Sequence, residues 1–473
     1  TAHDVVFTFN EVISDSTIAP AGLRRLFTIA DTMIRVSALD SHTVRFEPAS
    51  RYAALPALLT VPILPAHRYG PWVRRGIFEK MLASGTNADS MVGSGPFILA
   101  SHVPYQRVVL HRNPHYRQHD SAGTALPYLD SVVLSIADDL NARRLRLQNG
   151  HVDYLAARPR DYEELADSRS EGEFTIHRLG PALGSAWIVF NQNPRLAPSS
   201  DTTSTDAAML EWFTNNNFRR AVSYALDRQR MIDEVYAGHG HAQWSPLSPA
   251  NIRFHNPDVR ATPYDPDKAR ALLLAEGFKD SDNDEVLEDS EGNPVAFSLL
   301  VNDGNLSRIE IGRIVCENLE AVGLRVALEV VPQATLLERF TTHPYDWQAA
   351  MTGLAGTIDP ALLGQLWRSS GPMHLWHPAQ DSPATRWEKA VDSLFAAALH
   401  TGDYHERRAL YNDWQYLASE HLPLVFTVLP ERVLCIADRF RNINPTLYGG
   451  ILHNIEEFYV AESDGAAGQV AHR

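Results

Sequence analysis

The 473-residue sequence contains few cysteines and no long apolar segment. Its two cysteines, Cys316 and Cys435, lie far apart and form no CxxC pair, which excludes a disulfide-rich scaffold and a zinc ribbon. Buried single thiols behave as small hydrophobic side chains, so we expect both to be unpaired, with a disulfide between them as the alternative. No run approaches the roughly 20 apolar residues that span a bilayer. The sequence therefore predicts no membrane-spanning helix.

Clusters of positive charge are also missing. The chain has 42 lysines and arginines against 57 aspartates and glutamates, a net charge of −15, and no run of basic residues. Because phosphate groups bind to cationic stripes, we exclude a nucleic-acid partner and a surface for anionic membranes.

The common catalytic motifs are absent as well. The sequence contains no G-x-S-x-G elbow, no H-E-x-x-H, no phosphate-binding G-x-x-x-x-G-K-[ST] loop and no G-x-G-x-x-G followed by a helix. Without an activated nucleophile or a resident cofactor motif, we expect a binding protein and not an enzyme. An envelope hydrolase on a similar scaffold is the remote alternative.

The residues that are present indicate an α/β protein. With 44% hydrophobic residues the chain can bury a sizeable core, and its length predicts about three domains. Asp265 and Pro266 predict the N-cap and first residue of a helix. Another helix is predicted to end at Gly323 and to lead into a strand over 324–331. In this strand the predicted buried positions alternate with the others, and they are Leu324, Val326, Leu328 and Val330. A helix and a strand joined by a glycine are typical of an α/β unit.

Further segments have a clear pattern. We predict paired strands at 33–40 and 42–48, helices at 387–399 and 404–419, and apolar strand material at 422–437. The Ser-, Thr- and Asp-rich segment 195–206 is predicted to be an exposed loop, and the tail after Tyr459 to be disordered.

An acidic run between residues 280 and 291 resembles the order of ligands in an EF-hand calcium loop. The candidate metal ligands are Asp280, Asp282, Asp284 and Glu291, since carboxylate oxygens are the ligands that a hard cation prefers. Glu285 stands where such a loop needs glycine for its sharp turn. The two interpretations are an exposed acidic hairpin and a weak Ca²⁺ site.

Several blocks resemble one protein family in content and order. Between Met91 and Tyr154 the blocks are MVGSGPFILASH, VVLHRNPHYR, LPYLDSVVLSI and ADDLNARRLRLQNGHVDY. Downstream follow IVFNQNP at 188–194, FRRAVSYALDRQRMIDEVYAGHG at 218–240 and YDPDKARALLLAEGF at 264–278. This series resembles the family 5 extracellular solute-binding proteins, the peptide, dipeptide and nickel receptors of bacterial ABC importers.

The resemblance implies a two-lobed, three-domain fold like that of type II periplasmic binding proteins, with two hinge strands between the lobes. The opening TAHDVVFTFNEVI resembles a segment well inside the family, so the chain looks truncated at its N-terminus. We expect a partial second domain at 1–90, a first-lobe segment at 91–187, the second lobe at 188–428, and a return to the first lobe at 429–473.

The resemblance also implies where a solute binds. The segment Ala350–Ser369 resembles the family's cleft loop, which ends in Asp-Pro, here Asp359-Pro360. Peptide-binding members use an aspartate before that pair to hold the ligand's α-ammonium, and the nearest position here is Thr357. Either Asp359 takes this role or the ligand lacks a free ammonium. Asp359 as a simple helix cap is a further interpretation.

Three more residues are candidate ligand contacts. Asn191 lies where the first hinge strand leaves its lobe, a place where the family pairs its backbone with extended ligands. Trp367 and Trp376 are predicted to wall a pocket by stacking on the ligand, and local core packing is the alternative for both.

The expected function is capture of a small solute, an oligopeptide first, in a cleft between the lobes. The expected partners are an ABC permease and its ATPases, and the chain is expected to be monomeric and periplasmic or extracellular at the membrane. A nickel chelate, haem or an oligosaccharide is the alternative ligand. A carboxylate at the ligand end favours peptide, stacked tryptophans with amides favour sugar, and paired arginines or histidines favour a metal chelate.

Overall fold

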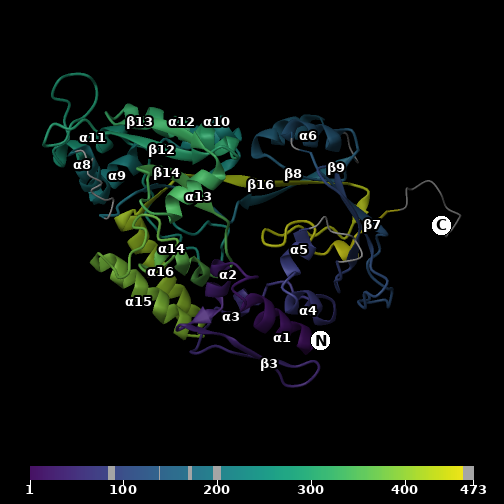
Figure 1. The fold of residues 1–473 in the computed structure, drawn as a ribbon. Coiled ribbons are helices and arrows are strands. Elements are labelled where there is room, and N and C mark those ends of the chain that lie inside the picture. Colours follow the sequence, from purple (N-terminus) through teal and green to yellow (C-terminus); the bar gives the residue numbers. More distant parts are fainter. Residues whose placement is uncertain (84–90, 138, 169–172, 195–203, 462–473) are drawn as a thin grey trace. The chain divides into compact units, whose positions relative to one another are not determined.

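The computed structural model in Figure 1 describes residues 1–83, 91–137, 139–168, 173–194 and 204–461. Contacts divide the chain into two compact units. The first unit comprises Thr1–Ala157, Asp161–Leu179 and Val433–Arg473, and the second comprises Arg158–Arg160 and Gly180–Arg432. Most of the predicted loop at 195–206 and most of the predicted disordered tail lie outside the described residues.

The second unit contains five strands that form its central sheet and most of the long helices. The strands are β10 Ser185–Phe190, β12 Ala296–Asn302, β13 Arg325–Val331, β14 Ala349–Leu354 and β15 Leu424–Phe426, and β11 Gly240–Ala242 lies outside this sheet. The helices are α8 Ser204–Thr214, α9 Asn216–Ala225, α10 Arg228–Tyr236, α11 Pro266–Ala275, α12 Leu306–Glu320, α13 Gln333–Thr341, α14 Gly364–Trp367, α15 Arg386–His400 and α16 Tyr404–His421, with a 3₁₀ turn at Pro360–Leu363.

The central sheet is mixed, with the strand order β13–β12–β14–β10–β15. β12 pairs in parallel with β13 and β14, whereas β10 pairs antiparallel with β14 and β15. Parallel strands need a crossover connection, and α12 provides it between β12 and β13. The predicted α/β unit is therefore confirmed.

Alternate residues of these strands build two separate cores. In β10, Ile188 and Phe190 join the cluster formed with helices α8–α12, whereas Trp187 and Val189 join the cluster formed with α13–α16. Successive side chains of a strand point to opposite faces, so one sheet is covered on both sides. Figure 1 shows these two groups of helices on either side of the sheet. The second unit is an α/β/α sandwich.

The helix ends agree with the sequence patterns. Asp265 caps α11 by accepting a hydrogen bond from the Lys268 amide, with Pro266 as the first helical residue. Gly323, after α12, has a φ of +86°, a conformation that glycine adopts without strain. The predicted alternation of buried and exposed residues fails at the end of the following strand, where Val330 is 46% exposed and Val331 is buried. β13 is an edge strand, so its far end is only partly covered.

The first unit consists of short elements around several small sheets. Its helices are α1 Ala2–Phe7, a π-helix at Thr8–Ile13, α2 Ala21–Leu26, α3 Leu55–Leu58, α4 Ala66–Arg74, α5 Phe78–Ala83, α6 Leu140–Gln148 and α7 Tyr162–Ser168. Its strands are β1 Thr28–Ile29, β2 Thr32–Met33, β3 Arg35–Ala38, β4 Val44–Glu47, β5 Phe97–Val103, β6 Arg107–Arg112, β7 Ser131–Ser135, β8 Tyr154–Ala157, β17 Phe440–Arg441 and β18 Tyr459–Val460. Strands β3 and β4 form the predicted antiparallel pair.

Two strands contain the boundaries between the units. β9, Phe174–Pro181, passes the boundary at Leu179/Gly180, and β16, Val428–Ala437, passes it at Arg432/Val433. The predicted division into three domains, with boundaries after 90, 187 and 428, stays a prediction.

Both cysteines are buried and unpaired, as expected. Burial raises the pKa of the Cys316 thiol to about 11 and that of Cys435 to about 12, so both thiols are protonated at neutral pH. Among the described helices, none is both long enough and apolar enough to cross a membrane.

Candidate functional site

A concave pocket of about 420 Å³ lies within the second unit. Its walls come from separate parts of the chain: 158–160 before α7, 182–186 at the start of β10, 235–236 at the end of α10, 305–311 at the start of α12, 351–355 at the end of β14, and 427–430 at the start of β16. Strand ends and helix ends thus meet at one edge of the sandwich.

The charged side chains that line this pocket all carry a positive charge. Apolar walls come from Ile311, Met351, Leu354 and Val428. The charged residues of the lining, drawn from the described chain, are three arginines, Arg158, Arg160 and Arg308, with no aspartate, glutamate or histidine. A pocket that is cationic in a chain of net charge −15 favours an anionic group in the ligand.

Close backbone contacts lie at and beside the pocket wall formed by β10 and β14. A Cβ atom at Gly353 would lie 2.3 Å from the Ser185 carbonyl oxygen, and one at Gly356 would lie 2.2 Å from that of Leu183. Only glycine fits at such distances, so these two positions let the end of β14 lie directly against the segment before β10.

Arg308 lies in the first turn of α12, half-buried at the pocket wall. Its Nη1 donates to Asn302 Oδ1 at 2.5 Å, and it has no ion-pair partner in the part of the chain that the structure describes. Burial lowers the pKa of Arg308, and the neighbouring Tyr236 partly opposes this shift. Burial likewise raises the pKa of Tyr236 to about 12, although the charge of Arg308 works against that rise. The phenol of Tyr236 is therefore protonated at neutral pH.

Arg160 differs from Arg308 because its charge is already matched. Its Nη1 lies 3.3 Å from Glu310 Oε1, and its Nη2 donates to the Glu234 carbonyl oxygen at 3.0 Å. The guanidinium of Arg160 thus holds residues 158–160 against α10 and α12.

Asn191, a predicted ligand contact, is 1% exposed and bonded within the protein. Its Nδ2 donates to the carbonyl oxygens of Tyr345 and Trp347, and its backbone N–H donates to that of Gln348. Main-chain pairing with a ligand was expected in this region, and the Asn191 amide already has a partner within the protein. In this structure Asn191 joins the end of β10 to the segment before β14.

Thr357 and Asp359 follow the pocket but are not among its lining residues. Thr357 Oγ1 donates to the Asp359 carbonyl oxygen. The Asp359 carboxylate accepts two bonds from Arg407 Nη2, at 2.7 and 2.9 Å, and caps the 3₁₀ turn through the Ala361 amide. Because this charge is paired, the geometry favours the cap interpretation over a grip on a ligand ammonium.

Trp367 and Trp376, the predicted pocket walls, are each 1% exposed. Their ring centroids lie 5.4 Å apart, and Trp367 also packs edge-on against Trp414 at 5.3 Å. Both rings belong to the core between the sheet and helices α14–α16. This position favours local core packing, the alternative that their Pro-rich surroundings had left open, and stacking on a ligand stays a prediction.

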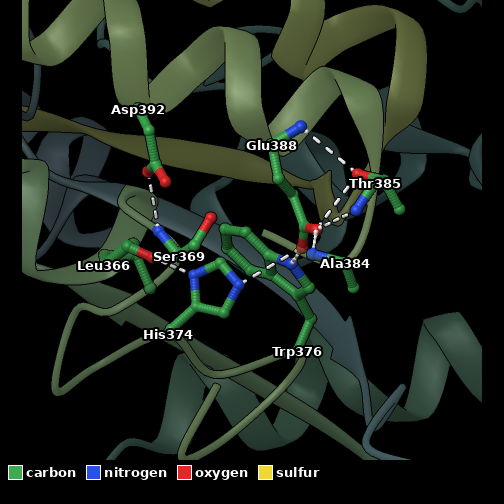
Figure 2. A network of polar contacts seen from close by, with 8 residues as sticks. All are labelled: Leu366, Ser369, His374, Trp376, Ala384, Thr385, Glu388 and Asp392. Atoms are coloured by element: carbon green, nitrogen blue, oxygen red, sulfur yellow. Dashed lines mark hydrogen bonds and ion pairs between the residues drawn. The ribbon is translucent and has the colours of Figure 1, made fainter. Parts of the chain in front are cut away.

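Glu388 organises the polar network beside these rings (Figure 2). One carboxylate oxygen accepts from Trp376 Nε1 at 3.1 Å and faces His374 Nε2 at 3.4 Å, and the other accepts from the amides of Ala384 and Thr385. Burial alone would raise the pKa of Glu388, but these hydrogen bonds outweigh it and lower the pKa to about 2. The buried anion is fully satisfied by the protein.

The acidic loop brings together a set different from the predicted one. Ligand atoms of Asp280, Asp282, Asp284 and Glu288 lie within 4.8 Å of one another, so Glu288 takes the place predicted for Glu291. Glu285, at the glycine position, has a φ of +72°. The carboxylates accept amide bonds within the loop, and Asp284 pairs with Arg325 at 3.0 Å.

The loop lies in a hairpin, because Lys279 and Glu288 form an antiparallel bridge, and Glu288 bridges to Pro294. This geometry explains the change of partner: Glu291 belongs to the next turn, where its amide donates to Asp289. A resident calcium ion stays a prediction.

The sequence patterns missed the arginines of the pocket. Arg308 had a signal, because a cation in the first turn of a helix opposes the helix dipole and such a position normally favours aspartate or glutamate. Arg158 and Arg160 come directly after β8, but nothing in the sequence connects them with α12. Their meeting requires the folded chain.

Comparison with known proteins gives the family of the sequence. The model of the family described as "Bacterial extracellular solute-binding proteins, family 5 Middle" matches residues 1–373. A probable ABC transporter-binding protein from Deinococcus radiodurans is 28% identical over 73% of this chain. The match spans 58% of the length of that relative, so part of it has no counterpart here.

Solved structures give the fold. The oligopeptide-binding protein AppA from Bacillus subtilis, in complex with a nonapeptide, is 24% identical with a TM-score of 0.73, covering 98% of this chain and 84% of that one. NikZ from Campylobacter jejuni, in complex with Ni(L-His), is 18% identical with a TM-score of 0.71, covering 97% and 84%. The predicted periplasmic binding protein-like α/β fold is confirmed.

Proposed function

The chain belongs to the bacterial extracellular solute-binding proteins of family 5, and on that premise we propose that it captures a peptide-like solute and delivers it to the permease of an ABC importer. Members of this family are transport receptors and not enzymes. The hydrolase alternative is therefore set aside.

The observation that carries the proposal is the pocket at the edge of the sandwich. Its volume of about 420 Å³ lies within the usual range for small-molecule sites, about 300–1,000 Å³. It combines apolar walls with a few polar groups at strand and helix ends, the composition that such sites share. A short peptide offers both side chains for the apolar walls and charged termini for the polar groups.

A metal chelate is the second candidate ligand. Three arginines and no carboxylate among the described lining residues fit an anionic chelate, and NikZ binds a nickel–histidine complex. An oligosaccharide fits less well, because tyrosine 236 is the one aromatic residue of the described lining and stacked tryptophans are not part of it.

The family also carries the proposal for partners and location. We propose a membrane permease with separate ATPases as partners, an extracytoplasmic location at the membrane, and a monomeric receptor.

A thermal-shift panel tests this proposal. It contains di- to decapeptides, nickel–histidine, haem and oligosaccharides, each at several concentrations. A ligand that binds only the folded state at 100 times its dissociation constant stabilises it by about 2.7 kcal/mol, so the melting temperature rises with concentration. We expect peptides to raise it. A shift with an oligosaccharide and with no peptide would contradict the assignment.

A further inference from the structure

The chain makes one very short visit to the second unit. Residues 158–160 belong to that unit, whereas Ala157 before them and Asp161 after them belong to the first. Ala157 pairs with Val433 of β16, and Asp161 is 6% exposed, so the residues on both sides are fixed within the first unit. Residues 158–160 are called the strap below.

The strap forms part of the pocket wall. All three of its residues, Arg158, Pro159 and Arg160, line the pocket, and Pro159 begins a 3₁₀ turn in which its ring restricts the backbone torsion φ. The other lining residues lie between 182 and 430, within the continuous part of the second unit. The strap is not continuous with that part, so its position in the wall depends on non-covalent contacts.

Arg160 supplies two such contacts. Its Nη1 lies 3.3 Å from Glu310 Oε1 on α12, and its Nη2 donates to the Glu234 carbonyl oxygen on α10 at 3.0 Å. An ion pair between Arg230 and Glu317, at 2.7 Å, joins these two helices to each other. One guanidinium therefore attaches the strap to a pair of helices that is held together independently of it.

The strength of the Arg160–Glu310 pair suits a reversible contact. The two side chains are 39% and 36% exposed, so water competes for both charges and salt screens them. A pair of this kind changes an equilibrium by a factor of up to about five. A solute that binds only to the complete wall has an apparent affinity that falls with the fraction of molecules in which the strap is in place.

We infer that Arg160 is a positioning residue for solute capture, because it holds the strap in the pocket wall through Glu310 and the Glu234 carbonyl group. This role rests on the proposed receptor function and acts through the wall, with no bond from Arg160 to the solute. Removal of either charge of the ion pair therefore weakens solute binding. The loss is smaller at high salt, since screening weakens the pair in the wild type.

Titration calorimetry tests this role with the member of the peptide, nickel–histidine, haem and oligosaccharide panel that raises the wild-type melting temperature most. We expect Arg160→Gln to bind it about 3- to 10-fold, and Glu310→Gln about 2- to 5-fold, more weakly than the wild type. The double variant should bind no more weakly than Arg160→Gln, because both changes break one contact. In 1 M NaCl the affinities of the wild type and Glu310→Gln should converge.

Hydrogen exchange in the protein without solute reports the strap directly. The amides of residues 160–162 should exchange faster in Arg160→Gln and Glu310→Gln than in the wild type. Arg160→Lys keeps the charge and should retain part of the wild-type affinity. The control is Arg313→Gln, an exposed arginine on α12, which should keep the wild-type affinity and exchange.

Two kinds of result would contradict the positioning role and leave the receptor function standing. The first is an unchanged affinity or an unchanged exchange rate in Arg160→Gln. The second is tighter binding by Glu310→Gln, which is the result expected if Arg160 binds an anionic solute itself and Glu310 competes for its charge. A wild type that binds no member of the panel contradicts the proposed function, and the positioning role falls with it.

Discussion

Two charged groups of the second unit show opposite ways of holding a charge inside a protein. Glu388 is 2% exposed and accepts bonds from Trp376 and from the amides of Ala384 and Thr385 (Figure 2). Arg308 is half-buried, with one bond to Asn302. Among the described residues, Glu388 has several hydrogen-bond partners and Arg308 has one.

The number of hydrogen-bond partners separates charges that stabilise the fold from charges that are free to contact a ligand. A buried ion without partners costs several kcal/mol, so folding alone favours sites such as that of Glu388. A half-buried cation with one acceptor, such as Arg308 at the pocket wall, gains less from folding and is a candidate for contact with a ligand. The pair Asp359–Arg407 belongs to the first kind, because both charges are used within the protein.

The largest expected effect follows removal of the buried Glu388 carboxylate. Glu388→Ala leaves the Trp376 N–H and the amides of Ala384 and Thr385 without their acceptor. We expect the free energy of unfolding to fall by about 3–5 kcal/mol, measured by urea denaturation. The exposed Glu338→Ala in α13 is the control and should change it by less than about 0.5 kcal/mol. Equal losses in both variants would show that the network does not stabilise the fold.

The ion pair at Asp359 is the next test. Asp359→Asn removes the charge that faces Arg407, and we expect a loss of about 1.5–3 kcal/mol in stability. Ligand affinity should stay within about twofold of wild type, because the carboxylate is paired inside the protein. A large loss of peptide affinity in a folded Asp359→Asn variant would favour the alternative in which Asp359 holds the α-ammonium of the ligand.

The pH dependence of the Glu388 network gives a smaller effect of known sign. Its pKa is lowered from 4.5 to about 2, so the folded state favours the ionised form. The stability contributed by this charge is fully present above pH 4.5 and is lost as the pH falls towards 2. In urea denaturation series, the stability difference between the wild type and Glu388→Gln should therefore shrink over that interval. A difference that is constant from pH 6 to pH 3 would contradict the assigned role.

Calcium should have the smallest effect. The carboxylates of Asp280, Asp282 and Asp284 already accept amide bonds in the loop, and Asp284 also pairs with Arg325. At a concentration equal to a dissociation constant of about 1 mM, calcium stabilises the fold by only about 0.4 kcal/mol. Differential scanning calorimetry with calcium and with EDTA measures this shift, and Asp282→Asn is the matched variant. A rise larger than about 2 kcal/mol at 1 mM would indicate a structural calcium site.

Local patterns predicted much of the fold and little of the site. The cap at Asp265, the α/β unit ending in β13 and the pairing of β3 with β4 all depend on neighbouring residues, so they could be inferred from spacing. The tryptophans at 367 and 376 could not be assigned, since an aromatic ring in a loop has the same sequence context in a core and in a pocket wall. Glu288 replaced Glu291 because the hairpin register decides which carboxylates converge.

The order of residues along the chain is enough to identify the family, the alternation of helix and strand, and the absence of common catalytic motifs from the sequence. Which charges are satisfied depends on how the chain folds. Arg160 and Arg308 are far apart in the sequence, and one is paired with Glu310 while the other is not. Charge pairing depends on distance in space over a few ångströms, and that distance is set when the sheet and its helices pack.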